Sequence, residues 1–262
     1  MTITQSTYDG ILYNVEMIKA RLQDYVENLH FDEAWLPHAT FHPFYHEMHA
    51  IGANRPRSTN AMVYATQSTH KLLAGLSQAS QILVQESETR RLDRYRFNES
   101  YLMHTSTSPQ YAIIASCDVA ASMMEAPGGT ALVQESLQEA RDFRRAMRKV
   151  EQEYDGSWWF RVWGPDSLGS GKEMRQEDWR LQANEKWHGF GPLESGFNML
   201  DPIKATIVTP GLDIEGEFAG SGIPAAVVTK YLAEHGVVVE KTGLYSFFVM
   251  FTIGITKGRW NT

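Results

Sequence analysis

The sequence predicts an α/β protein with a mixed, mostly parallel sheet, followed by a smaller α+β region. Up to about residue 152, short apolar strand patterns alternate with helical patterns, which favours a largely parallel sheet. Beyond that point, aromatic and β-branched strands are separated by loops rich in Gly and Pro. The chain has 262 residues, 43% of them hydrophobic, which is enough for one large or two modest domains. We therefore expect domains at 1–152 and 153–262.

The first region begins with short elements. Thr2–Thr4 is typical of a strand and Ser6–Gly10 of a turn. Apolar residues at helical spacing predict a helix over Asn14–Leu29, whose first residue is a suitable N-cap. His30–Trp35 is typical of a strand end running into a loop. Prolines and glycine predict mostly irregular backbone at 36–60.

The middle of the chain alternates again. Strands are predicted at Met62–Thr66 and Ile82–Val84, with a polar turn at Gln67–Lys71 after the first of them. Helices are predicted at about 109–125 and 130–152, and the second is dense in charged residues and good helix formers.

The last region has a different pattern. A helix is predicted at Pro224–Glu234, with its proline near the first turn, and a loop at 164–186. Strands are predicted at Ser157–Trp163, Ile203–Val208, Val237–Val239 and Phe247–Ile255.

Composition narrows the classes of function. A net charge of −7 argues against nucleic-acid binding, which usually needs a basic face. A single Cys cannot close an intrachain disulfide or supply a Cys-rich zinc site, and it suits a reducing compartment. The sequence shows no secretion-signal pattern and no apolar run of about 20 residues; the longest, Tyr245–Ile255, predicts a buried strand. We expect a cytoplasmic protein without membrane or nucleic-acid partners.

Several motifs carry little weight. His38, His42, His46 and His49 have the spacing of one helical face, but Pro43 interrupts that helix, so a His-rich loop is favoured over a metal site.

Three further candidates are also discounted. Gly169–Lys172 lacks the first Gly and the final Ser or Thr of a phosphate-binding loop. Cys117 lies in an apolar helical stretch typical of a buried, unreactive thiol. Ser221 lacks the strand–turn–helix setting of a nucleophile elbow.

Lys71 is the strongest candidate for chemistry. A lone Lys after a strand is usually solvated, but Ser68 and His70 precede this one and an apolar, small-residue run follows it. A low-dielectric setting favours the free amine over the ammonium ion, as a Schiff-base lysine requires. The Ser and His side chains could bind an anion such as a phosphate.

Asp32 is the second candidate. An Asp at a strand end is ordinarily a turn or cap residue. One crossover separates it from Lys71, so both can lie at the carboxyl edge of neighbouring parallel strands, where open α/β sheets bind ligands. An ionised Asp there can keep a heterocyclic nitrogen protonated.

The run Thr66–Ser80 resembles the pyridoxal-phosphate attachment signature of the bacterial ornithine/lysine/arginine decarboxylases. That signature is Ser, one residue, His-Lys, two residues, two small residues, one residue, a small residue, Gln and two small residues, and every position matches. Other family-like blocks follow one another in the family's order: Ser6–Gly10, Asp32–Trp35, His104–Pro109, Trp187–Phe190, Asp201–Lys204 and Val239–Gly243.

The resemblance implies roles for individual residues. Lys71 would hold pyridoxal phosphate as a Schiff base, and Asp32 would pair with its pyridinium nitrogen. Ser68 and His70 would contact the phosphate or brace the ring, with His70 and Lys71 as the catalytic pair. Trp35 would line the cofactor and substrate pocket.

Two more roles concern the partner subunit and the substrate. Ser106 matches the family position that reaches the cofactor phosphate of the partner subunit, which implies a homodimer or a larger assembly with its active site at the interface. Glu240 is a candidate for binding the distal cation of the substrate, although a charged residue at a strand end is an equal alternative.

The implied fold is a partial aminotransferase-like, fold type I pyridoxal-phosphate domain followed by a truncated small domain. Family members are longer: they carry an N-terminal flavodoxin-like wing and a first half of the cofactor domain, with a Ser/Thr phosphate site and a stacking aromatic ring. We expect an interior piece of such a protein, and half a parallel sheet alone would expose an edge and an apolar face.

The implied reaction removes CO2 from lysine, arginine or ornithine and leaves the amine, with the protonated ring accepting the charge. The block Val239–Gly243 resembles the lysine and ornithine enzymes, whereas 257–260 and Trp158–Phe160 resemble the arginine enzyme, so the substrate stays open. Acid resistance and polyamine supply stay open as well.

Two alternatives remain. The first is a non-catalytic fragment or interaction module that keeps Lys71 without a full cofactor site. The second is another pyridoxal enzyme, such as an aminotransferase, which the complete decarboxylase signature disfavours.

Overall fold

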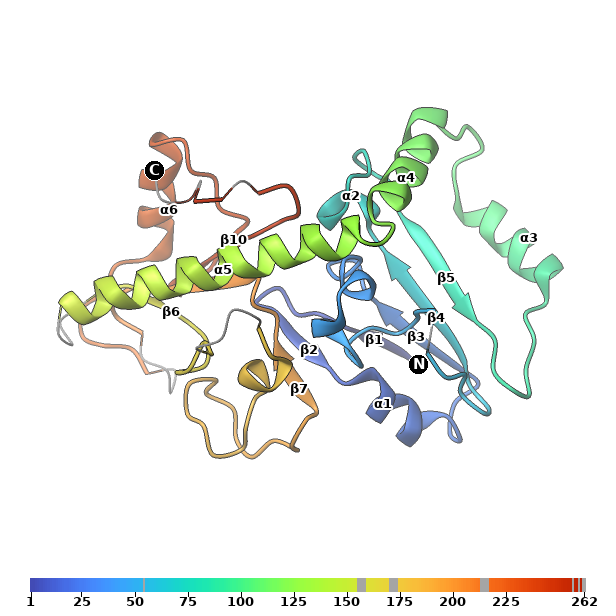
Figure 1. Cartoon of the computed structure of the whole chain (residues 1–262), viewed down its shortest axis with the longest axis horizontal. Coiled ribbons are helices and arrows are strands. Elements are labelled where there is room, and N and C mark those ends of the chain that lie inside the picture. Colours follow the sequence, from blue (N-terminus) through green and yellow to red (C-terminus); the bar gives the residue numbers. More distant parts are fainter. Residues whose placement is uncertain are drawn as a thin grey trace. The chain divides into compact units, whose positions relative to one another are not determined.

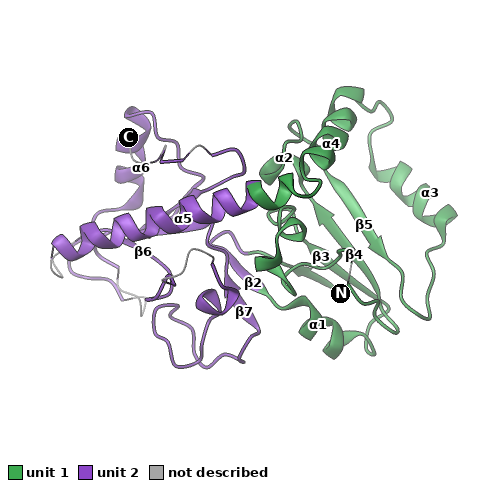
Figure 2. Cartoon of the chain, in the orientation of Figure 1, with its two compact units in different colours: residues 1–6, 13–131 green, residues 7–12, 132–262 purple. Residues whose placement is uncertain are grey.

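The computed structural model describes residues 1–53, 55–154, 159–169, 174–212, 217–255, 257, 258 and 260. They form two compact units (Figure 2). Unit 1 comprises residues 1–6 and 13–131, and unit 2 comprises 7–12 and 132–262. The expected domains, 1–152 and 153–262, concern the longer protein and remain a prediction. Among the described helices, none combines the length and apolar character needed to cross a membrane.

Unit 1 is built on a four-stranded sheet (Figure 1). Its order is β1 (Thr2–Thr4), β3 (Asn28–Asp32), β4 (Met62–Gln67) and β5 (Gln81–Gln85). The first three strands are parallel and β5 is antiparallel to β4. The mixed, mostly parallel sheet predicted from the alternation of strands and helices is therefore confirmed.

The register of β3 and β4 decides which side chains share a face. Leu29 pairs with Val63 and Phe31 with Ala65, and all four are fully buried. Because side chains alternate along a strand, the half-buried Asp32 and its partner Thr66 lie on the opposite face. This alternation separates a core face from the face that carries Asp32.

The first helix is shorter than predicted. α1 runs over Val15–Leu22, and Asn14 is its N-cap, accepting a hydrogen bond from the Met17 N–H at 3.0 Å. The predicted helix continued to Leu29, but that residue belongs to β3. Its apolar side chain matched the helical period, yet it is buried by strand pairing, so tertiary contacts override the local pattern.

Other parts of unit 1 match the sequence pattern more closely. In the expected irregular segment, the described residues 36–53 and 55–60 form two 3₁₀ turns, Ala39–Phe41 and Pro43–Tyr45, and otherwise no regular element. The helices predicted at 109–125 and 130–152 are α4 (Tyr111–Met123) and α5 (Gly128–Glu153); the division between the units falls inside α5. α2 (Thr69–Leu72) is a single turn after β4.

α3 (Arg94–His104) was not predicted. None of its residues is buried, so no apolar stripe marks it in the sequence. Its local signal is Asp93, whose side chain accepts hydrogen bonds from the N–H groups of Tyr95 and Arg96.

The described part of unit 2 contains two sheets, of which the larger is antiparallel. One sheet has the order β6 (Arg161–Val162), β8 (Lys204–Val208), β10 (Ser246–Met250) and β9 (Lys241–Thr242). A second pairs β2 (Ile11–Tyr13) with β7 (Asn198–Leu200). The described residues of unit 2 also form most of α5, α6 (Ala225–Glu234) and a 3₁₀ turn at Gln176–Trp179. Ile207, Ala225 and Phe247 form a buried cluster.

Three strand predictions in this unit need correction. Val237–Val239 is not a strand: Val238 is 88% exposed, and the nearest strand is β9. The strand predicted at Phe247–Ile255 ends at Met250, because Met250 pairs with Lys204, the first residue of β8. Only β6 is found within the predicted strand Ser157–Trp163, whose first two residues lie outside the described part.

A buried arginine fixes the interior of unit 2. Arg144 of α5 donates hydrogen bonds to the carbonyl oxygens of Trp163 (2.7 Å), Lys204 (2.8 Å) and Pro202 (3.3 Å). Burial lowers the pKa of this guanidinium to about 9. These carbonyls stabilise the charge and hold α5 against β8 and the loop before it.

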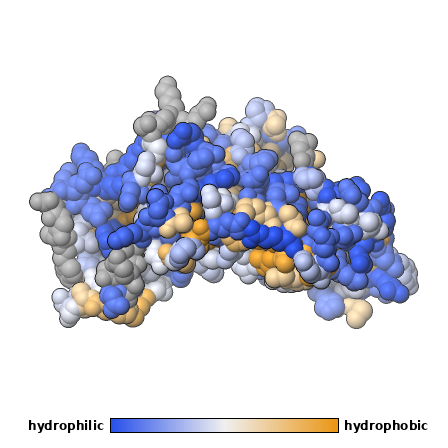
Figure 3. Space-filling view, turned by 90° about the horizontal axis from the view of Figure 1, so that it is seen from below, coloured by the Kyte–Doolittle hydropathy of each residue, from blue (hydrophilic) through white to orange (hydrophobic). Residues whose placement is uncertain are grey.

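The surface is mixed. On the face drawn in Figure 3, mostly hydrophilic side chains surround a few small hydrophobic patches. Two helices of unit 1, α3 and α4, carry large exposed apolar side chains: Tyr95, Tyr101, Leu102, Met103, Tyr111, Ile114, Val119 and Met123.

Candidate active site

Asp32 and Lys71 leave the sheet of unit 1 at the same edge. Asp32 is the last residue of β3 and pairs in register with Thr66, the penultimate residue of the parallel strand β4. Lys71 follows in α2, directly after β4. Parallel neighbouring strands bring their carboxyl ends together, so the two residues share one edge, as the sequence predicted.

Lys71 lies over an indole ring. Its Nζ atom is 4.5 Å from the ring centroid of Trp35, and both side chains are half-buried. This cation–π contact holds the amine beside the segment that follows Asp32. Asp32 itself accepts a hydrogen bond from the Ala34 N–H at 3.1 Å, which folds the chain into a tight turn toward Trp35.

His70 is oriented by the backbone. Its Nδ1 atom is 2.8 Å from the carbonyl oxygen of Ala79, and its own N–H donates to the same oxygen at 3.1 Å. A carbonyl oxygen only accepts, so Nδ1 carries the proton. Nε2 is then the ring nitrogen that can accept a proton or bind a ligand.

The small residues after Lys71 have a packing role. A Cβ atom on Gly75 would lie 2.9 Å from the Cβ of Ala79 and 3.0 Å from the Cγ2 of Thr69. The Leu76 N–H also donates to the Ser116 hydroxyl of α4 at 2.9 Å. The loop therefore folds back tightly on α2, which explains small residues at this point of the motif.

The three remaining predicted site residues belong to different segments of the chain. Ser68 is half-buried and precedes α2 as its N-cap residue. Ser106 lies in the exposed loop between α3 and α4, where its hydroxyl accepts a hydrogen bond from the Ser108 N–H at 3.1 Å. Glu240 is exposed and belongs to unit 2, and its N–H donates to the Phe248 carbonyl oxygen.

The sequence matches the family described as Orn/Lys/Arg decarboxylase, major domain, over residues 1–259. The chain belongs to this decarboxylase family. Lysine decarboxylase LdcA of Pseudomonas aeruginosa PAO1 is 53% identical over 261 residues, which cover 99% of this chain and 35% of that protein.

Other members agree with this assignment. The solved structure of lysine decarboxylase A from Pseudomonas aeruginosa has a TM-score of 0.92 and 52% identity, and the match covers 99% of this chain and 35% of that one. The biodegradative arginine decarboxylase of Escherichia coli K12 is 40% identical over 277 residues, covering 99% of this chain and 37% of that protein. The chain thus spans about a third of the length of the curated relatives it matches.

Glu33 is a buried carboxyl residue next to the candidate site that the sequence pattern did not predict. Its side chain is completely buried, and burial raises the pKa of its carboxyl to about 7. Its Oε1 atom accepts from the Ala50 N–H at 2.5 Å and its Oε2 from Gln67 Nε2 at 2.7 Å. The sequence offered no distinct signal, because Glu33 follows another carboxyl residue at the strand end.

The structure also describes parts of the discounted motifs. Among the described residues, no cluster of three or more His, Cys, Asp or Glu side chains could hold a metal ion. Gly169 is half-buried at the edge of the described part, and Ser170–Lys172 lie outside it. Cys117 is half-buried in α4, not fully buried as predicted, and Ser221 is exposed.

In unit 2, Asp9 is the centre of a small group of hydrogen-bonded side chains. Asp9 accepts hydrogen bonds from the Thr206 hydroxyl and from Lys241 Nζ, both at 2.9 Å. It borders a cavity of about 560 Å³ that Trp163, Trp187 and Arg161 also line. Lys241 follows Glu240, so this group anchors the segment that carries the candidate substrate residue.

Proposed function

We propose that this chain is the lysine-bearing part of a pyridoxal-phosphate-dependent decarboxylase that converts a basic amino acid to its amine and CO2. One observation carries the proposal: the Lys71 amine lies over Trp35 at the sheet edge where β3 ends in Asp32. Family membership supports the same chemistry.

The donor set fits the cofactor. Lys71 supplies a primary amine for covalent attachment to an aldehyde, and Asp32 supplies a carboxylate for a protonated ring nitrogen. Ser68 and the Nε2 atom of His70 can contact the phosphate or the ring. When bound, pyridoxal phosphate supplies an electron sink for the electron pair that remains on the substrate carbon when CO2 leaves.

The chain's own residues have positioning and proton roles in this proposal. Trp35 keeps the Lys71 amine near the place where the cofactor ring would bind, and its indole excludes water from one side of that amine. His70, oriented through Nδ1, can hold a proton at Nε2, and Lys71 can return one to the substrate carbon once CO2 has left.

The finer features of the assembly are part of the proposal. We infer an aminotransferase-like cofactor domain completed by the rest of a longer, cytoplasmic polypeptide, and a homodimer with its active site at the interface. The exposed apolar side chains of α3 and α4, on either side of Ser106, support an interface there. Ser106 would then contact the cofactor phosphate of the partner subunit.

Lysine is the favoured substrate. Sequence identity is 53% to a lysine decarboxylase, against 40% to an arginine decarboxylase and 30% to an ornithine decarboxylase. Glu240 is the proposed contact for the distal ammonium group of the substrate.

The test uses the complete polypeptide that carries this chain. With added pyridoxal phosphate, the wild type should absorb visible light, and borohydride should fix the cofactor on Lys71 by mass spectrometry. Lys71→Ala should lose both signals, whereas Lys230→Ala, at an exposed position of α6, should keep them. Activity should be highest with lysine in a panel with arginine and ornithine.

A wild type without the visible band or the Lys71 adduct would overturn the catalytic proposal in favour of a non-catalytic module. A clear preference for arginine or ornithine would overturn only the choice of substrate.

A further inference from the structure

Glu33 places a second carboxyl group directly behind the candidate site. It follows Asp32 in the chain and is completely buried, whereas Asp32 is half-buried. Side-chain alternation directs it to the core face that Leu29 and Phe31 occupy, opposite the face that carries Asp32. Glu33 therefore cannot share the role of Asp32, and its burial needs another explanation.

Hydrogen bonds across the sheet edge give that explanation. Glu33 accepts from Gln67 Nε2 at 2.7 Å, and Gln67 Oε1 in turn accepts from Gln81 Nε2 at 2.7 Å. The Glu33 N–H also donates to the Thr66 carbonyl oxygen at 2.9 Å. One side chain from the end of each of β3 and β4 is thus joined to the first residue of β5.

The two linked residues flank the site residues directly. Glu33 follows Asp32, and Gln67 precedes Ser68, the first residue of the lysine motif. A change in the Glu33–Gln67 contact would shift Asp32 relative to Ser68 and Lys71. Misplacement of reacting groups by about 1 Å can cost about 100-fold in rate.

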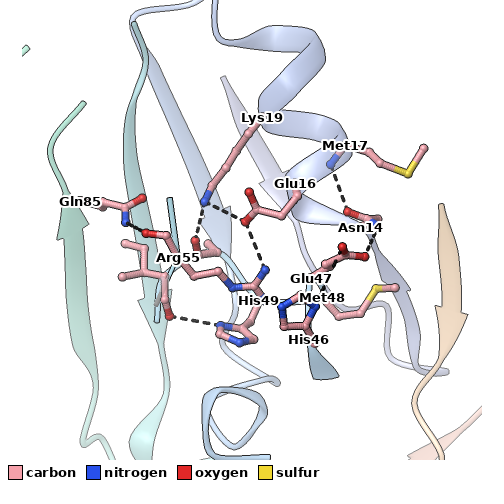
Figure 4. A network of polar contacts seen from close by, with 12 residues as sticks. Asn14, Glu16, Met17, Lys19, His46, Glu47, Met48, His49, Arg55 and Gln85 are labelled. Atoms are coloured by element: carbon pink, nitrogen blue, oxygen red, sulfur yellow. Dashed lines mark hydrogen bonds and ion pairs between the residues drawn. The ribbon is translucent and has the colours of Figure 1, made fainter. Parts of the chain in front are cut away.

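The other carboxylate oxygen is held from the opposite side. The Ala50 N–H donates to Glu33, and the Ala50 carbonyl oxygen accepts from Lys19 Nζ at 2.9 Å. Lys19 is paired with Glu16 at 3.2 Å, and Glu16 also pairs with Arg55 at 3.3 Å (Figure 4). The backbone of Ala50 is therefore held at both its N–H and its carbonyl oxygen, so Glu33 has little freedom to move.

We propose that Glu33 is a positioning residue of the active site, which sets the distance between Asp32 and the Ser68–Lys71 segment through Gln67. This inference rests on the proposed pyridoxal-phosphate function. Glu33 touches neither substrate nor cofactor, and its effect passes through the residues beside it.

The test is a swap of the two linked side chains in the complete polypeptide. In Glu33→Gln, an amide NH2 replaces one carboxylate oxygen and faces the Gln67 NH2 in the native arrangement, and relief requires both Gln67 and Gln81 to turn their amides. In Gln67→Glu, two carboxylates face each other. In the double variant, Gln at 33 accepts from Ala50 and donates to Glu at 67, which still accepts from Gln81.

Each single variant should bind pyridoxal phosphate about tenfold more weakly, as measured by visible absorbance at pH 8, the scale of a lost charged hydrogen bond. The swap should restore affinity to within about threefold. A matched control is Glu139→Gln in unit 2, a buried carboxylate that accepts from the Gly258 N–H and Trp260 Nε1. Thermal unfolding of every variant separates positioning from loss of fold.

Three results would overturn the inference while the wild type still binds the cofactor at Lys71. Affinity could be unchanged in both single variants, the swap could fail to restore it, or Glu139→Gln could lose as much affinity at the same loss of stability. A wild type without cofactor binding would instead refute the proposed function itself.

Discussion

Asp32 and Glu33 are consecutive carboxyl residues that one strand places in opposite environments. Asp32 ends on the half-buried face beside Trp35, and Glu33 is enclosed among Ala50, Gln67 and the core. Burial is the largest cause of the raised pKa of Glu33; its two hydrogen bonds and the cations Lys19 and Arg55 oppose it. Strand alternation alone thus places two carboxyl groups in different environments, which suit the different roles proposed for them.

The raised pKa of Glu33 predicts a pH dependence of stability. The folded carboxyl, with a pKa of about 7, binds a proton more readily than the unfolded one at 4.5. The wild type should therefore lose stability relative to Glu33→Gln as pH rises from 4.5 to 7, by about 3 kcal/mol, and no further above that.

Urea unfolding of both proteins at several pH values measures this difference. A constant difference over the whole range would contradict the prediction, and so would a difference of the opposite sign.

At the scale of elements, the site depends on how β3 and β4 end. Both strands contribute fully buried apolar pairs, and both are followed at once by polar residues that leave the sheet. The tight return of 73–79 onto α2, fixed by Gly75 and Ala79, then holds the lysine turn in place.

These elements could be predicted where the local pattern and the packing agree. Met62–Thr66 is flanked by turn residues and forms β4, and Pro224–Glu234 has an apolar pattern with a proline at its start and forms α6. Local pattern failed where long-range pairing decides, as at Leu29 in β3. It also failed at α3, which has no buried stripe to reveal it.

The candidate site follows the same rule. Lys71 and His70 could be predicted as candidates because their motif is local in sequence, and Asp32 because it ends a strand one crossover before that motif. The partnership of Glu33 with Ala50, Gln67 and Gln81 joins segments far apart in the chain, so the sequence alone contains no sign of it.

α3 should depend on its cap. Asp93→Ala removes the acceptor of two N–H groups at the start of a helix that buries no side chain, at a cost of about 1 kcal/mol. Hydrogen exchange of the first-turn amides should accelerate about fivefold. Glu99→Ala, an exposed change in the same helix, should leave their exchange unaltered, and equal rates in both variants would refute the capping role.

At the scale of the whole molecule, this chain spans about a third of the length of its relatives. Its exposed apolar side chains on α3 and α4 are consistent with surfaces that further chain or a second subunit covers. The proposed homodimer commits α4 to contact between two copies.

Ile114 of α4, which is 54% exposed, offers a test. Ile114→Glu places a charge in the proposed interface and should raise the dimer dissociation constant about tenfold or more. Analytical ultracentrifugation of the complete polypeptide measures it. Val227→Glu on α6, at a residue that is 60% exposed, is the control, and an equal effect of both changes would refute the assignment.

The alternation of side chains along β3 has a consequence for changes in chain length. Deleting one residue between Leu29 and Asp32 would move Glu33 into the place of Asp32 and Ala34 into the place of Glu33. The face that now carries Asp32 would then carry a longer carboxylate. In the core, Ala34 would offer no acceptor to the Ala50 N–H and the Gln67 amide. We therefore expect this segment to accept side-chain replacements far more readily than insertions or deletions, which makes its length a design constraint for any engineered variant.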